Sequence, residues 1–137
     1  YDEVSLSSAV EKATAYINQH EVLAEKLNKP VVLEEFGISR DDNDHAVTAS
    51  VTLRDEYYSQ IFTHILDKAA AGSPLAGLNF WAWGGAGRPR EPQAIWYVGD
   101  DFTGDPPHEH QGWYSVYNTD LTTLEIIGRY TRKFNSL

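Results

Sequence analysis

Two short apolar runs constrain the fold of this chain more than any other feature. They are VVLEE, from Val31 to Glu35, and LAGLNFWAW, from Leu75 to Trp83. In both, apolar residues follow one another without the strict alternation of a half-exposed strand, which is typical of parallel strands covered on both faces. Apolar residues before and after these runs recur at helical spacing. The order predicts an α/β fold with a parallel sheet.

Helices are predicted around these strands. The first spans residues 8–27, where Ser8 and the Glu three positions later have the form of a capping box. The second spans 53–71 and carries a wide apolar stripe, and the last spans 122–134. A long polar segment from about 84 to 121 precedes the last helix, and a loop of that length in a compact domain is normally functional.

The predicted strands are too few for a complete sheet. Two parallel strands leave two edges of unpaired backbone groups and cannot bury both faces. The 137 residues suffice for one small domain, and 42% of them are hydrophobic, so a packed core is feasible. We therefore expect residues 1–137 to form part of a larger α/β fold, without an internal boundary. Because the chain begins with Tyr1 and lacks a signal-peptide pattern, we expect a processed or excised piece.

Composition argues against several kinds of partner. The net charge is −9, which disfavours nucleic acid and anionic membrane surfaces. No apolar run approaches the roughly 18–20 residues that span a bilayer, so no membrane insertion is expected. The absence of cysteine excludes disulfides and thiolate chemistry. The acidic run 41–44 lacks the spacing of an EF-hand, and the HEH of 108–110 lacks helical ligand spacing, so we predict neither a metal nor another cofactor.

The carboxyl ends of the two runs carry residues that suit sugar chemistry. Ligands of parallel α/β sheets lie beyond these ends, where Glu35 and Trp81 would be neighbours. A carboxylate can attack or stabilise an anomeric carbon, and an indole can stack on the sugar ring. All four tryptophans fall within 81–113, in stretches rich in Gly, Pro and Asp. This favours a ligand role for at least one of them, against the alternative of core packing.

The adjacent glutamates are expected to have different roles. Strand side chains alternate, so Glu34 and Glu35 should point to opposite sides. On this pattern Glu35 shares a face with Val31 and Leu33 and lines the site, unless it is only a structural carboxylate. Glu34 then points toward the surrounding helices and forms a salt bridge or hydrogen bond there.

Three motifs, KPVVLEEFG, LAGLNFWAWGG and WYVGDDFTGDPPHEHQGWYSVY, closely resemble the C-terminal part of β-mannanases of glycoside hydrolase family 5. The resemblance covers nearly the whole chain. It implies the C-terminal third of a (β/α)8 barrel, with strands seven and eight and their flanking helices, that cleaves β-1,4-mannosidic bonds with retention. It makes Glu35 the nucleophile and Trp81 the floor of the cleft. Trp83 and Arg88 are further candidates for substrate binding, with packing under the long loop and a solvated charge as their alternatives.

The family pattern also requires an acid/base Glu after an Asn, and no Asn-Glu pair occurs in the sequence. A retaining glycosidase needs two carboxyl groups about 5–5.5 Å apart. We therefore expect this chain to supply the nucleophile half of a site and to be inactive alone. Expected partners are β-mannan or a related polysaccharide and a second chain that carries the rest of the barrel, in an extracellular or periplasmic location implied by the resemblance. The alternative is a non-catalytic carbohydrate-binding fragment or an inactive excised piece.

Overall fold

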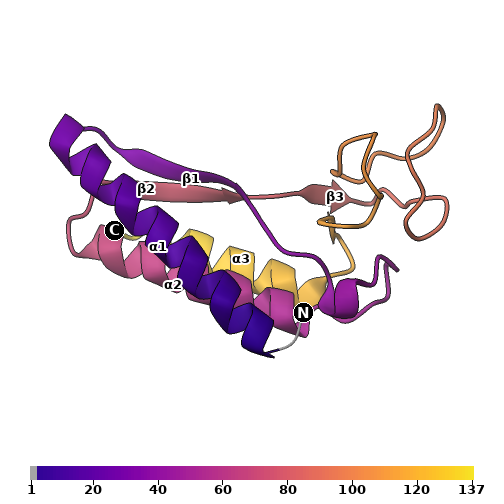
Figure 1. The fold of residues 1–137 in the computed structure, drawn as a ribbon, viewed down its shortest axis with the longest axis horizontal. Coiled ribbons are helices and arrows are strands. Elements are labelled where there is room, and N and C mark those ends of the chain that lie inside the picture. The colour runs from indigo at the N-terminus through magenta and orange to yellow at the C-terminus, as the bar shows by residue number, and fades with distance from the viewer. Residues whose placement is uncertain (1–2) are drawn as a thin grey trace.

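The computed structural model describes residues 3–137 and shows an α/β fold with parallel strands, as predicted (Figure 1). The order of the main helices and strands follows the sequence prediction. In chain order the elements are α1 (Glu3–Leu27), β1 (Val31–Phe36), the 3-10 turn η1 (Asp41–Asn43), α2 (Thr52–Ala70), β2 (Leu75–Phe80), β3 (Trp83–Gly85), β4 (Val116–Tyr117) and α3 (Leu121–Phe134).

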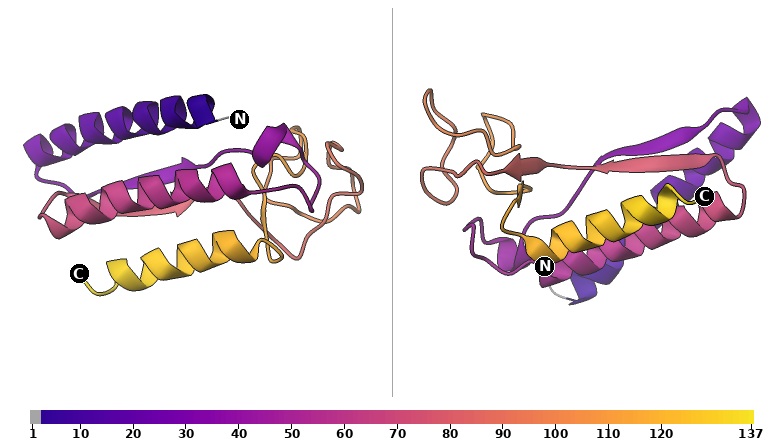
Figure 2. Two further views of the ribbon diagram at one scale, coloured as in Figure 1. Left: turned by 90° about the horizontal axis from the view of Figure 1, so that it is seen from below. Right: turned by 180° about the vertical axis from the view of Figure 1, so that it is seen from behind.

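The helices form one layer and the sheet another. β1 and β2 pair in parallel, and α1, α2 and α3 lie side by side on one face of this pair (Figure 2). The apolar stripe of α2 fills the space between the layers, where Tyr58, Ile61 and Ile65 are fully buried. Within residues 3–137 no helix covers the opposite face, and none is both long and apolar enough to cross a membrane.

The first helix begins earlier than predicted. α1 starts by Glu3, so Ser8 and Glu11 lie inside the helix and the predicted capping box is wrong. Leu6 explains the difference, because it is only 4% exposed and belongs to the core. Together with Ile17 on the same helix it extends the apolar stripe upstream of the polar pair, and burial of that stripe outweighs a local capping preference.

The second predicted strand is divided. β2 ends at Phe80, a cis peptide bond joins Trp81 to Ala82, and β3 follows. The Ala82 backbone bonds instead to the long loop, since its carbonyl accepts from the Val116 N–H at 2.8 Å. β4, which the sequence analysis placed in an irregular segment, pairs in parallel with β3. Two residues are too few to show a periodic pattern, so β4 could not be predicted.

Candidate active site

The carboxyl ends of β1 and β2 are in direct backbone contact, which confirms their predicted proximity. The Trp81 N–H donates to the carbonyl of Phe36 at 2.8 Å. Gly37 lies against the Trp81 carbonyl, and a Cβ at this position would approach that oxygen to 2.3 Å. Only glycine fits here without a shift of the backbone. The close approach holds Glu35 and Trp81 on neighbouring strand ends.

β1 stops alternating near its end. Leu33 pairs with Leu78 and Phe36 pairs with Phe80, so β1 contains one residue more than its partner over this stretch. Glu35 has a φ of 53°, in the left-handed region that few non-glycine residues adopt. The extra residue and the unusual φ of Glu35 together define a β-bulge. A bulge changes the direction in which side chains point and is common beside active sites.

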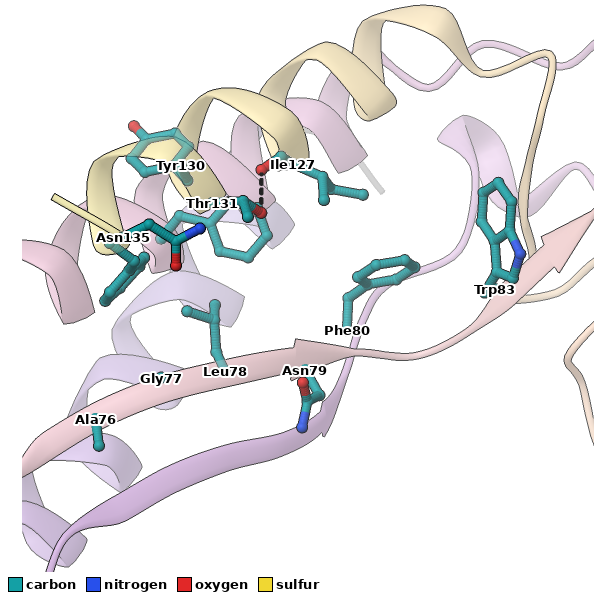
Figure 3. A pocket seen from close by; sticks show the side chains of 12 residues that line it. Ala76, Gly77, Leu78, Asn79, Phe80, Trp83, Ile127, Tyr130, Thr131 and Asn135 are labelled. Carbon is teal, nitrogen blue, oxygen red and sulfur yellow. Dashed lines mark hydrogen bonds between the residues drawn. The ribbon is translucent and has the colours of Figure 1, made fainter.

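The predicted division of faces in β1 is therefore wrong. Val31 and Leu33 pack against the core on the helix side, whereas Glu34 is exposed. The Asn79 amide donates to the Glu34 carboxylate at 2.9 Å, and Figure 3 shows Asn79 pointing to the opposite side of β2 from Leu78. Glu34 thus has its predicted hydrogen bond, but on the face of the sheet away from the helices.

Glu35 carries a carboxylate without a protein partner. Its side chain is exposed, and within residues 3–137 it forms no hydrogen bond or ion pair. Glu34 beside it is bonded to Asn79. Of the two glutamates, Glu35 is the one whose oxygens are free to react with a ligand.

The tryptophans of the strand end differ in exposure. Trp81 is half-buried and Trp83 is 54% exposed. Trp83 also borders a pocket of about 410 Å³ between β2 and α3 (Figure 3). That pocket follows the edge of β2 that does not pair with β1, and neither Glu35 nor Trp81 lines it. It is a gap beside an open sheet edge, distinct from the strand ends.

Arg88 braces the start of the long loop. Its guanidinium donates to the carbonyls of Gly85 (3.1 Å) and Gly87 (2.7 Å). It also donates to the side-chain oxygen of Asn118 at 2.6 Å and lies 4.9 Å from the centroid of the Tyr117 ring. These contacts give Arg88 a role in holding the loop, and its sugar-binding role stays a prediction.

A buried ionic cluster beneath the strand ends escaped the sequence analysis. Asp120 accepts from Arg40 at 2.9 and 2.7 Å, from Arg54 at 2.7 Å and from the Tyr117 N–H at 2.8 Å. Arg40 is 1% exposed and Arg54 is fully buried. Burial raises the pKa of Asp120, but the combined effect of these donors is larger and in the opposite direction. The pKa of Asp120 therefore lies below its usual value. The sequence did offer one indication of this cluster. Arg54 lies four residues before Tyr58, so it falls on the apolar, buried stripe of α2.

The acidic run after β1 caps a helix. The Asp41 carboxylate accepts from the N–H groups of Thr52 and Leu53, at 2.9 Å each, and so satisfies the start of α2. In the part of the chain that the structure describes, no group of three or more His, Asp or Glu side chains could hold a metal ion.

A second contact joins the loop after β1 to the long loop. His45 is 3% exposed and stacks on Trp113, with ring centroids 5.9 Å apart, while His110 lies 6.0 Å away. Burial lowers the pKa of His45, and His110 lowers it further, against smaller opposite effects of Asp105 and Asp44. The buried imidazole of His45 therefore packs between the two loops, and burial favours its neutral form.

Comparison with known proteins identifies the family. The model of the glycoside hydrolase family 5 β-mannosidase-like proteins matches residues 1–137, so the chain belongs to this family. It is similar to a family 5 mannosidase from Rhizomucor miehei solved as a variant with mannosyl-fructose (TM-score 0.85, 35% identity over 98% of this chain and 33% of that chain). Two further structures of that mannosidase give TM-scores of 0.83 and 0.84 at 35% and 36% identity, over 98% and 96% of this chain and 34% and 33% of theirs. The chain thus spans about a third of these relatives, and no curated protein matches it.

Proposed function

We propose that this chain supplies the nucleophile half of a retaining glycoside hydrolase that cleaves β-1,4-mannosidic bonds. The observation that carries the proposal is the state of Glu35, an exposed carboxylate that lies on a bulge at the end of a parallel strand and forms no hydrogen bond or ion pair within residues 3–137. Trp81 follows the end of the neighbouring strand, and its backbone N–H donates to the carbonyl of Phe36, the residue after Glu35. Support for a mannoside comes from the family and from the relatives, which are described as mannosidases.

The chemistry follows from these two groups. A Glu35 oxygen attacks the anomeric carbon and forms an ester as the glycosidic C–O bond breaks, while an acid/base carboxylic acid protonates the leaving oxygen. Water, deprotonated by the same acid/base group, then cleaves the ester and restores Glu35. The Trp81 indole supports the ring by stacking. We assign the acid/base group to sequence outside these 137 residues, because the family pattern places it after an Asn and no Asn-Glu pair occurs here.

The sheet supports the placement in a barrel. β1 and β2 each have one unpaired edge, and within residues 3–137 one face of the pair lacks a covering helix. We place them as strands seven and eight of a (β/α)8 barrel, with residues 1–137 as its C-terminal third. Neighbouring barrel strands, from the same or a second chain, would then pair with both edges.

Labelling of the nucleophile tests the proposal. The complete protein that carries these residues is treated with a 2-deoxy-2-fluoromannosyl fluoride, which traps the glycosyl ester of a retaining enzyme. We expect the label on Glu35 by mass spectrometry and a loss of mannan hydrolysis of at least about a thousandfold in Glu35→Ala. Glu34→Gln is the matched control and should still be labelled at Glu35. Hydrolysis that survives Glu35→Ala, or a label on another residue, would refute the assignment.

A further inference from the structure

A stacked aromatic pair stands out on the loop between β3 and β4. The rings of Trp96 and Phe102 are 5.4 Å apart between centroids and only 13° from parallel. Phe102 is nevertheless 75% exposed, and Tyr97 next to the pair is 69% exposed. Exposed aromatic faces gathered on one loop are typical of a binding surface rather than of core packing.

The backbone next to the pair lies close to β3. A Cβ on Gly87 would come within 2.0 Å of the Phe102 carbonyl, and one on Gly84 within 2.4 Å of the Thr103 carbonyl. The backbone of Phe102 therefore packs against the end of β3, the strand that begins with Trp83. This loop, orange in Figure 1, lies beyond the carboxyl ends of the strands, and part of it rises on the side of the sheet away from the helices.

The aromatic pair is held by bonds within the loop. Arg90 donates to both carboxylate oxygens of Asp100, at 3.0 Å each, and the Tyr97 N–H donates to the same carboxylate at 2.9 Å. The Trp96 indole N–H donates to the Asp100 carbonyl at 3.1 Å. A surface ordered in advance loses little conformational entropy when a ligand binds.

We propose that Trp96, Phe102 and Tyr97 form a second sugar platform, which binds a pyranose ring of the mannan chain beyond the rings held at Glu35 and Trp81. This inference rests on the proposed function. The aromatic faces match the apolar face of a sugar ring, and the Arg90–Asp100 pair at the rim offers planar polar groups to its hydroxyls. A neutral polysaccharide also suits a chain with a net charge of −9.

Chain-length dependence tests the platform. In the complete protein, kcat/KM is measured for mannotriose and mannohexaose with the variants Phe102→Ala and Tyr97→Ala. We expect the ratio of the long to the short substrate to fall about fivefold in Phe102→Ala, from the loss of one ring contact. Leu27→Ala is the control, because Leu27 is 70% exposed at the opposite end of the sheet, and its ratio should equal that of the parent.

Binding separates this inference from the proposed function. With Glu35→Ala as background, calorimetry with mannohexaose should show a Kd about fivefold higher when Phe102→Ala is added. A parent that hydrolyses no mannoside but shows this difference refutes the proposed function and supports the platform. If the ratio of kcat/KM values and the Kd for mannohexaose are the same with and without the Phe102 ring, the platform is overturned and the proposed function is not affected.

Discussion

Replacing Asp120 by Asn is expected to weaken the whole site end of the fold. Asp120 is the carboxylate between two buried guanidiniums, and it binds Arg40, Arg54 and the Tyr117 N–H. Asn keeps the shape but removes the charge, so both guanidiniums stay buried without that counterion. Removing one partner of a buried ion pair costs about 3–5 kcal/mol, a large share of an ordinary folding free energy.

Equilibrium urea unfolding of the complete protein measures this loss. Tryptophan fluorescence is a local probe, because all four tryptophans lie within 81–113. Arg90→Met is the matched control, because it removes the ion pair between Arg90 and Asp100, whose arginine side chain is 52% exposed. An exposed pair contributes at most about 1 kcal/mol, so the control should unfold almost as the parent does.

A second substitution checks the cause. If uncompensated charge is responsible, adding Arg40→Gln to Asp120→Asn removes one of the two stranded guanidiniums. The double variant should then lose less free energy than the sum of the two single variants. A loss below about 1 kcal/mol in Asp120→Asn, or additive losses in the double variant, would refute the reasoning.

Two further predictions concern the loops around the site. Gly37→Ala should lower the free energy of unfolding by about 1–3 kcal/mol in urea titrations, because its Cβ meets the Trp81 carbonyl. Gly128→Ala in α3 should be neutral or stabilising, because its Cβ would meet only the flexible side chain of Arg132, at 3.4 Å. His45 has a folded-state pKa below its unfolded value of about 6.5, so the unfolded state binds the proton more readily. The contribution of His45 to the free energy of unfolding should be complete above that pH and should be lost as the pH drops below it. In melting curves from pH 8 to 5, the melting temperature of His45→Gln should fall less than that of the parent. An equal fall in both proteins would contradict the role of the buried imidazole.

Residue patterns predict the elements that have long, regular signals. The continuous apolar runs located β1 and β2, and the stripe of Tyr58, Ile61 and Ile65 located α2, because burial of these side chains is what stabilises the elements. The proximity of Glu35 and Trp81 followed from parallel strands alone. β4 could not be found in this way, because it has only two residues and pairs with β3 across the long loop.

Charged residues inside the fold are the second kind of feature that patterns miss. A sequence shows that Arg40 and Asp120 are charged and 80 positions apart, but not that they are bonded to each other in the interior. Their burial depends on the exact meeting of three segments, the loop after β1, α2 and the start of α3. Such a cluster is visible only once the tertiary contacts are known.

The bulge in β1 explains how adjacent glutamates can differ in role without facing opposite layers. In a regular strand one of the two side chains would have to point into the helix layer, where burying a carboxylate is costly. The extra residue at Glu35 removes this requirement, since Phe36 can still enter the core while both carboxylates remain exposed. The Asn79 amide then donates a hydrogen bond to Glu34, and within residues 3–137 no group donates one to Glu35. The different environments of the two glutamates therefore come from one inserted backbone residue and one amide, and not from strand alternation.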